Sequence, residues 1–340
     1  MLRNFTPMED RFGHHISYLR VSITDRCNER CIYCMPQELQ EWLPRSEVLN
    51  YDEITRLVRI ASELGVVKVR LTGGEPLTRR DVLTLFRQLN ALPRINDIGV
   101  STNGSLLAKP LESGETLAEA LVKFRVRTAN ISLDTLDPEK YRAITGRDFL
   151  QQTLDGIAAA KAAGFEKVKL NAVLMRGRNE EDVGDLIRFA RREDLLLRFI
   201  ELMPVSTTDV LDEQNFWSIG EARRKIEAEF GPLIPEPEFR TNGPALYYRF
   251  EDSEQRIGFI GAMTNLHFCE SCNKLRLTCD GKLRPCLGSH LEFDIKTPMR
   301  QGASDEQLRC FFLEVVERKP QQHDFRYNYQ PGRKMVAIGG

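Results

Sequence analysis

Two hydrophobic periodicities alternate along the first two thirds of the chain. Short apolar runs that are typical of buried strands are each followed by a longer stretch whose apolar residues recur at helical spacing. The strands are predicted at 16–23, 66–71, 97–102, 129–133, 167–173 and 195–202, and the helices at 51–64, 79–91, 115–124, 138–144, 149–163 and 180–192. Such alternation favours a parallel sheet with helices outside it. Because a closed barrel has eight strand–helix units and this chain has six, we expect an open, partial (β/α)6 barrel of the TIM type.

The last third of the chain has a different pattern. Four prolines between residues 232 and 244 mark a crossover, and two short strands are predicted after it, at 246–250 and 256–261. We therefore expect three parts: a flexible N-terminus at 1–15, the barrel at 16–240, and a C-terminal extension at 241–340 that ends in Gly339 and Gly340.

Cationic and amide side chains alternate with the apolar ones in the predicted strands. Helices cover the outer face of a parallel barrel, so the apolar residues point outward and the alternate residues point into the lumen. The predicted inward set is Arg20, Lys68, Arg70, Asn130, Ser132, Asp134, Lys169, Asn171 and Arg198. Buried cations are costly unless paired, and the carboxylates of Asp134 and Glu201 can pair with only some of them. The lumen is therefore predicted to bind an anion such as a phosphate, although any one of these residues could instead form an ordinary salt bridge.

Three cysteines, Cys27, Cys31 and Cys34, follow the first predicted strand within eight residues. Such a loop can bind a [4Fe–4S] cluster, and three thiolates for four irons would leave one iron open. Disulfides fit less well, because the number of thiols is odd and no secretory signal precedes them. Structural zinc needs four ligands, and His14 and His15 lie on the other side of the strand.

A second cysteine group lies in the last third. Cys269, Cys272 and Cys286 have the spacing CxxC-x13-C, and Cys279 lies between them. This spacing allows either a second three-cysteine cluster or a four-cysteine zinc ribbon. The choice depends on whether Cys279 is a ligand.

Composition narrows the classes of function. The net charge is −1, so the bulk charge does not favour binding to nucleic acid or to a membrane. No apolar run has membrane-spanning length. Eight cysteines without a secretory signal fit a reducing compartment, so a cytoplasmic protein is expected.

The stretch from Cys27 to Cys34, with Tyr33 before the last cysteine, resembles the radical S-adenosylmethionine (SAM) enzymes. Thr72-Gly-Gly-Glu-Pro76 resembles the glycine motif of that family. The resemblance implies that SAM binds the open iron, and that an electron from the cluster cleaves SAM to methionine and a 5′-deoxyadenosyl radical. It also implies SAM-binding positions, which are Tyr33, Gly74, Ser132 and Met203.

Further motifs, spread over nearly the whole chain, resemble the GTP 3′,8-cyclase family, the radical SAM enzymes that begin molybdenum cofactor biosynthesis. They are Arg-Leu-Thr-Gly-Gly-Glu-Pro (70–76), Ser-Thr-Asn-Gly (101–104), Ile-Thr-Gly (144–146), Phe-Glu-Lys-Val-Lys (165–169), Arg-Phe-Ile-Glu-Leu-Met-Pro (198–204), Cys-Glu-Ser-Cys-Asn-Lys-Leu-Arg (269–276) and the terminal Gly-Gly. The resemblance implies that the radical removes hydrogen from C3′ of GTP and that C3′ then attacks C8, giving (8S)-3′,8-cyclo-7,8-dihydroguanosine 5′-triphosphate. It also implies a second [4Fe–4S] cluster on Cys269, Cys272 and Cys286, which binds guanine at its open iron and leaves Cys279 as a spare thiol.

The same resemblance assigns roles to individual residues. The implied GTP-binding residues are Arg20, Arg70, Ser101, Lys169, Lys274, Leu275 and Arg276. Lys274 stands where the family commonly has arginine. The lysine keeps the positive charge but lacks the planar guanidinium that can form two parallel hydrogen bonds. Arg276, Gly339 and Gly340 are implied to belong to the catalytic site. The implied partners are an electron donor, a downstream cyclic pyranopterin monophosphate synthase, and a second copy of the chain in a homodimer.

Two other functions stay open at the level of the sequence. A radical SAM maturase that modifies a peptide would use the second cluster for electron transfer and would not need a phosphate-binding lumen. A binding protein with two zinc sites would contain zinc without sulfide, whereas two clusters predict about eight irons per chain.

Overall fold

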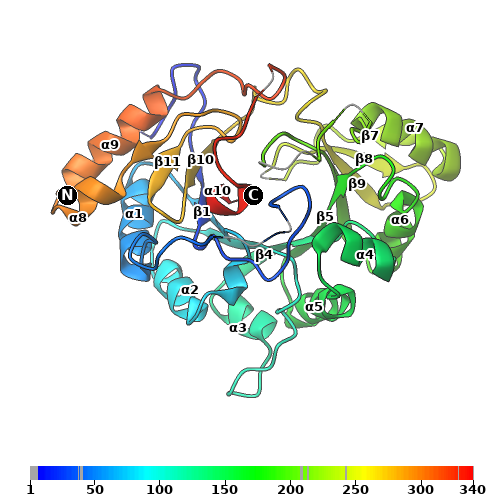
Figure 1. The fold of residues 1–340 in the computed structure, drawn as a ribbon, viewed down its shortest axis with the longest axis horizontal. Helices are drawn as coiled ribbons and strands as arrows, with labels where there is room; N and C mark the ends of the chain where they lie inside the picture. The colour runs from blue at the N-terminus through cyan, green and yellow to red at the C-terminus, as the bar shows by residue number, and fades with distance from the viewer. Residues whose placement is uncertain are drawn as a thin grey trace.

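One curved sheet organises the chain (Figure 1). The structure is a computed structural model that describes residues 7–36, 38, 41–206, 210–212, 214–241, 243–327 and 329–339. Within these ranges, twelve strands are hydrogen-bonded in the order β12-β11-β10-β1-β2-β3-β4-β5-β6-β9-β8-β7.

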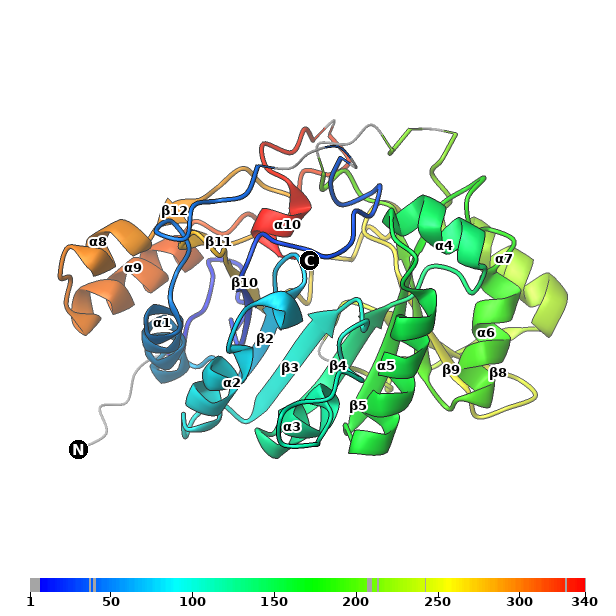
Figure 2. The ribbon, with the colours of Figure 1, turned by 60° about the horizontal axis from the view of Figure 1, so that its bottom comes forward.

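The middle of the sheet is the predicted partial barrel. Its parallel strands are β1 (Tyr18–Ser22), β2 (Lys68–Thr72), β3 (Asp97–Thr102), β4 (Val126–Ser132), β5 (Lys167–Leu174) and β6 (Leu196–Glu201). The helices are α1 (Tyr51–Glu63), the short 3-10 helix η1 (Pro76–Thr78), α2 (Val82–Asn90), α3 (Leu117–Lys123), α4 (Pro138–Thr145), α5 (Leu150–Ala163) and α6 (Val183–Arg192). Figures 1 and 2 show the long helices outside the curved sheet. The predicted α/β fold is confirmed, and the observed strand and helix limits differ from the predicted ones by a few residues.

The last third of the chain extends both edges of the same sheet. After α7 (Ile219–Phe230), one edge gains β7 (Leu233–Pro235), β8 (Leu246–Phe250) and β9 (Arg256–Ile260), with β9 parallel to β6. The other edge gains β10 (Lys274–Leu277), β11 (Lys282–Arg284) and β12 (Phe293–Asp294), with β10 parallel to β1. The helices α8 (Lys296–Arg300), α9 (Asp305–Glu317) and α10 (Met335–Ile338) follow. Strands as short as β10, β11 and β12 show too few periods to be predicted from a hydrophobic pattern.

The hydrophobic core lies between the sheet and the outer helices. Leu19, Val21 and Leu71 are fully buried there, as the alternation along β1 and β2 predicts. The N-terminus of α1 is closed by a capping box in which Asn50 and Glu53 each accept a hydrogen bond from the other's backbone. Local sequence therefore both starts the helix and turns its apolar face inward.

Residues 7–15, which belong to the segment predicted to be flexible, pack against the barrel. The side chain of Met8 is fully buried, and its backbone N–H donates to the Leu64 carbonyl at 2.8 Å. The carboxylate of Asp10 accepts from the backbone N–H groups of Phe12 and His14. Residues 1–6 lie outside the described residues.

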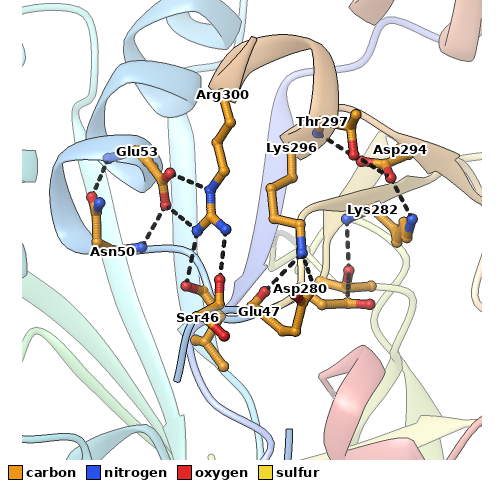
Figure 3. Close-up of polar contacts among 12 residues, drawn as sticks. Ser46, Glu47, Asn50, Glu53, Asp280, Lys282, Asp294, Lys296, Thr297 and Arg300 are labelled. Atoms are coloured by element: carbon orange, nitrogen blue, oxygen red, sulfur yellow. Dashed lines mark hydrogen bonds and ion pairs between the residues drawn. The ribbon is translucent and has the colours of Figure 1, made fainter. Parts of the chain in front are cut away.

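The segment that leads from the cysteine loop to α1 is tied to the C-terminal third (Figure 3). The Lys296 ammonium donates to the backbone carbonyl of Glu47 at 3.1 Å and to its carboxylate at 2.5 Å. Arg300 forms an ion pair with Glu53 in the first turn of α1. Helix α8 thereby holds residues 46–53 at one edge of the sheet.

Candidate active site

The curved sheet encloses a cavity of about 370 Å³, a volume within the range of small-molecule binding sites. Its lining includes the whole inward set predicted from the strands: Arg20, Lys68, Arg70, Asn130, Ser132, Asp134, Lys169, Asn171 and Arg198. It also includes other predicted site residues: Cys27, Cys31, Tyr33, Cys34, Gly74, Ser101, Met203, Cys269, Cys272, Lys274, Arg276 and Cys286. Segments that are 250 residues apart in the chain thus meet in one chamber.

The first cysteine loop rests directly on Gly73 and Gly74, the glycine pair that follows β2. The backbone N–H of Gly74 donates to the carbonyl of Thr24 at 2.8 Å. A Cβ on Gly73 would lie 2.4 Å from that carbonyl oxygen, and a Cβ on Gly74 would lie 2.3 Å from the oxygen of Arg26. The two glycines are therefore required because the cysteine loop approaches them so closely.

Carboxylates surround this first cysteine group. Tyr33 donates from its hydroxyl to Asp134 at 2.7 Å, and Tyr141 donates to Glu29 at 2.6 Å. Burial raises the pKa of Glu29 to about 7 and that of Asp134 to about 6. Burial, and then the charge of Asp134, raises the pKa of the Cys34 thiol to about 12. Binding of iron to these sulfurs must therefore displace protons.

The Glu75 carboxylate has a structural use. It accepts hydrogen bonds from the Leu77 N–H at 3.0 Å, the Thr102 hydroxyl at 2.9 Å and the Asn103 N–H at 2.7 Å. These bonds start η1 and join the end of β2 to the end of β3. Burial nevertheless raises the pKa of Glu75 to about 7.

The opposite end of the lumen is cationic. The guanidinium of Arg70 donates to the Tyr18 hydroxyl at 2.7 Å and to the Val100 carbonyl at 2.9 Å. Burial would raise the pKa of Tyr18, but the charges of Arg70, Arg20 and Lys68 outweigh it and lower this pKa to about 7. Lys68 itself forms an ion pair with Asp97.

Lys169 is a buried cation of the lumen. Its side chain forms no hydrogen bond or ion pair with any residue that the structure describes. Burial, and then the charges of Arg198 and Arg70, lowers the pKa of Lys169 to about 6. An anion in the lumen would remove the charge repulsion that causes part of this shift.

Three buried polar atoms in the lumen lack a hydrogen-bond partner within the described part of the chain. They are Asn130 Oδ1, Asn171 Oδ1 and Arg198 Nε. Buried polar atoms are normally paired, so such atoms on a cavity wall indicate a polar ligand.

The second cysteine group lies across the cavity from the first one. Burial raises the pKa values of the Cys269 and Cys286 thiols, although the backbone N–H groups of His323 and Gly288 act to lower them. The ammonium of Lys319 lies 3.5 Å from the sulfur of Cys272. These three cysteines and the three of the first loop form no disulfide, so all six thiols are free.

Cys279 is separated from the other three cysteines of the last third. It does not line the cavity, and its sulfur lies 3.9 Å from the carbonyl of Ala337, beneath α10. Cys279, the possible fourth ligand of a zinc ribbon, is therefore not placed with Cys269, Cys272 and Cys286. Within the described ranges, no group of three His, Cys, Asp or Glu side chains is arranged around a single metal-ion position.

The C-terminal tail enters the barrel, as the end of the chain in Figure 1 shows. Gly339 has φ +85° and its carbonyl accepts from Arg276 at 2.6 Å. A Cβ at Gly339 would lie 2.8 Å from Thr72 Cγ2 and 2.9 Å from Ser22 Cβ. The tail therefore lies against the carboxyl ends of β1 and β2. Gly340, which was also predicted in the site, lies outside the described residues.

One predicted contact residue does not reach the cavity with its side chain. Leu275 is 1% exposed and packs in the core, because it alternates along β10 with Lys274 and Arg276, which do line the cavity. A motif of consecutive residues cannot present every side chain to the same face of a strand.

The structure adds residues that the sequence did not single out. Tyr18 lies on the cationic wall, and Lys319 and His323 lie beside the second cysteine group. The alternation along β1 would have placed Tyr18 on the inward face with Arg20. No local pattern marks Lys319 or His323, because both follow α9 in irregular structure.

Replacing Gly74 with Ala is expected to disrupt the first cysteine loop. The added methyl group would overlap a backbone carbonyl, which cannot move like a flexible side chain. We expect the iron content of the reconstituted protein to fall from about eight to about four per chain. Gly220→Ala is the matched control, because the nearest atom to its Cβ lies 3.8 Å away. An unchanged iron content in the Gly74 variant would contradict the prediction.

Two sequence families together match most of the chain. Residues 21–190 match the radical SAM superfamily, and residues 195–325 match the family described as Molybdenum Cofactor Synthesis C. The chain is therefore a radical SAM protein with the C-terminal region typical of molybdenum cofactor synthesis. Membership of this superfamily implies an iron–sulfur cluster and SAM as cofactors.

Curated relatives narrow the family. The chain is 43% identical over 333 residues to the GTP 3′,8-cyclase of Moorella thermoacetica, covering 98% of this chain and 100% of the relative. It is 42% identical over 338 residues to that of Marinobacter nauticus, covering 98% and 99%. The chain belongs to the GTP 3′,8-cyclase family.

Solved structures share the fold at lower identity. Streptococcus suis SuiB bound to precursor peptide SuiA has a TM-score of 0.59 at 16% identity, covering 98% of this chain and 70% of that one. Native anSMEcpe with bound AdoMet has a TM-score of 0.60 at 15% identity, covering 91% and 82%. These neighbours support the architecture of the chain. The shared fold does not identify the substrate, which depends on the residues that line the cavity. Within the described residues, no helix is both long and apolar enough to cross a membrane.

Proposed function

We propose that this protein is a radical SAM enzyme that converts GTP to (8S)-3′,8-cyclo-7,8-dihydroguanosine 5′-triphosphate, the first step of molybdenum cofactor biosynthesis. The observation that carries the proposal is a buried cationic lumen between two cysteine groups, in a chain of this family. A peptide-modifying enzyme with the same fold would have no need for this concentration of cations.

Two groups of residues would hold the cofactors. Cys27, Cys31 and Cys34 would bind the cluster that binds SAM, and Cys269, Cys272 and Cys286 would bind a second [4Fe–4S] cluster. When bound, the first cluster and SAM supply a 5′-deoxyadenosyl radical, which removes the hydrogen from C3′ of GTP. The residues of this chain bind and orient the reacting groups.

The cations fix the triphosphate at the end of the lumen opposite the first cysteine loop. Arg198 has an Nε donor without a partner among the described residues, Lys169 lines the same cavity, and Arg70 is held in place by Tyr18 and by the Val100 carbonyl. Arg20, Ser101, Lys274 and Arg276 line the same cavity. Because the triphosphate is the most highly charged part of GTP, this set determines the orientation of the ribose.

The SAM side of the site is formed by the ends of the central strands. Tyr33, Gly74, Ser132 and Met203 line the cavity near the first cysteine group. The hydrogen bond from Tyr33 to Asp134 fixes the aromatic ring beside Cys34. The second cysteine group would hold the guanine base at the opposite wall, so that C3′ faces the radical source and C8 lies within reach of C3′.

The proposal is tested with anaerobic, reduced protein that has both clusters reconstituted. With SAM and GTP together, 5′-deoxyadenosine and the cyclised nucleotide should form in equal amounts. With SAM alone, formation of 5′-deoxyadenosine should be slow. If GTP had no effect on the rate of 5′-deoxyadenosine formation, the cyclase assignment would be wrong.

The electron donor, the downstream cyclic pyranopterin monophosphate synthase, the homodimer and the cytoplasmic location stay predictions.

A further inference from the structure

A buried lysine with no role so far lies beside the second cysteine group. Lys319 follows the end of α9 and is 3% exposed. A buried ammonium is costly unless each of its protons has an acceptor. The hydrogen-bond acceptors around Lys319 therefore indicate its role in the structure.

The three protons of Lys319 have three acceptors, and all belong to the segments that carry the cysteines. Its Nζ lies 2.6 Å from the carbonyl oxygen of Pro285, 3.3 Å from that of Lys274, and 3.5 Å from the sulfur of Cys272. Pro285 immediately precedes Cys286, and Lys274 follows Cys272 by two residues. One side chain thus joins the CxxC segment to the segment that carries the third cysteine.

The charged side chains near the two cysteine groups are opposite in sign. Near the first group lie the carboxylates Glu29 and Asp134. Near the second group lies the ammonium of Lys319, 3.5 Å from the sulfur of Cys272. Hydrogen bonds to sulfur and the local net charge are the protein's main means of setting the potential of an iron–sulfur cluster.

We propose that Lys319 is a positioning residue for the second cluster, where it joins the two ligand-bearing segments and stabilises the reduced, more negative state of the cluster. The inference rests on the proposed second cluster, but it does not depend on the identity of the substrate. It gives Lys319 a measurable electrochemical role besides its packing.

The test isolates the second cluster. In a full-length background with Cys27, Cys31 and Cys34 all replaced by Ala, only the second group can bind iron, and about four irons per chain are expected. The midpoint potential is then measured by redox titration followed by electron paramagnetic resonance, without SAM or GTP. In this background Lys319→Met should favour the oxidised cluster by at least tenfold, which is a negative shift of about 59 mV for one electron.

Two further variants separate charge from structure. Lys319→Arg keeps the charge and should recover most of the shift, whereas Lys319→Gln keeps hydrogen-bond donors without charge and should behave like Met. Lys296→Met is the matched control, because Lys296 is also a buried lysine but bonds to Glu47 at the edge of the sheet (Figure 3). It should leave the potential unchanged.

Several outcomes would overturn the inference. They are an unchanged potential and iron content in Lys319→Met, an equal shift in Lys296→Met, and no iron in the parent triple-alanine protein. Loss of iron in the Met and Gln variants but not in Arg, with circular dichroism showing folded protein, would support it. The redox titration contains no GTP, so it does not depend on the identity of the substrate. A shifted potential together with a negative cyclase assay would therefore contradict only the substrate assignment.

Discussion

Replacing Lys169 with Met is expected to weaken GTP binding by roughly tenfold to a hundredfold and to leave SAM binding nearly unchanged. A hydrogen bond to a charged group contributes about 1.5–3 kcal/mol, and about 1.4 kcal/mol corresponds to tenfold in Kd. Lys169 reaches the lumen from β5, in the cationic wall and not among the predicted SAM-binding residues. Isothermal titration calorimetry with each ligand measures both affinities, and an equal loss of both would contradict the assigned role.

The pH dependence gives an independent signature of the same residue. In the free protein the pKa of Lys169 is lowered to about 6, mainly by burial, so at pH 8 the side chain is mostly neutral. A bound triphosphate favours the charged form and raises this pKa. GTP binding at pH 8 should therefore take up close to one proton, and GTP affinity should fall as pH rises from about 6 toward the higher pKa of the complex.

Proton uptake is read from calorimetry in buffers of different ionisation enthalpy. The uptake should disappear in the Lys169→Met variant. Lys167→Met is the matched control, because Lys167 lies on the same strand two residues earlier but is exposed. It should retain both the affinity and the proton uptake of the parent protein. Uptake that persists without Lys169 would show that another group takes the proton.

Replacing Gly339 with Ala is expected to reduce formation of the cyclised nucleotide by at least tenfold, which corresponds to about 1.4 kcal/mol. The backbone at this position has φ +85°, and the new methyl group would overlap the side chains of Thr72 and Ser22. The tail should therefore withdraw from the ends of β1 and β2. Arg276 would then lose the acceptor that Gly339 provides in the buried site.

The loss should appear in turnover rather than in GTP affinity, because the cations of the lumen remain in place. Single-turnover assays and calorimetry distinguish the two effects. Gly332→Ala is the control within the same tail, because no atom lies within 4 Å of its Cβ position. If Gly339→Ala turned over as fast as the control, the tail would have no part in the reaction.

Features of the fold and of the site are predictable from the sequence where they depend on interactions between neighbouring residues. Strand alternation is a property of neighbouring residues, so it correctly placed Arg20, Lys169 and Arg198 on the cavity wall from sequence alone. By the same rule the side chain of Leu275, which the motif resemblance predicts to bind GTP, points into the core.

The amino-acid sequence by itself determined the six strand–helix units, the inward cations and the two thiol groups, because each is encoded by periodicity or spacing over a few residues. Only the tertiary structure decided that the two glycines after β2 support the cysteine loop and that Gly339 meets Arg276. It alone showed that Lys319 bonds to Cys272, 47 residues earlier in the chain. These contacts join segments distant in sequence, and no local pattern records a partner that folding alone brings near.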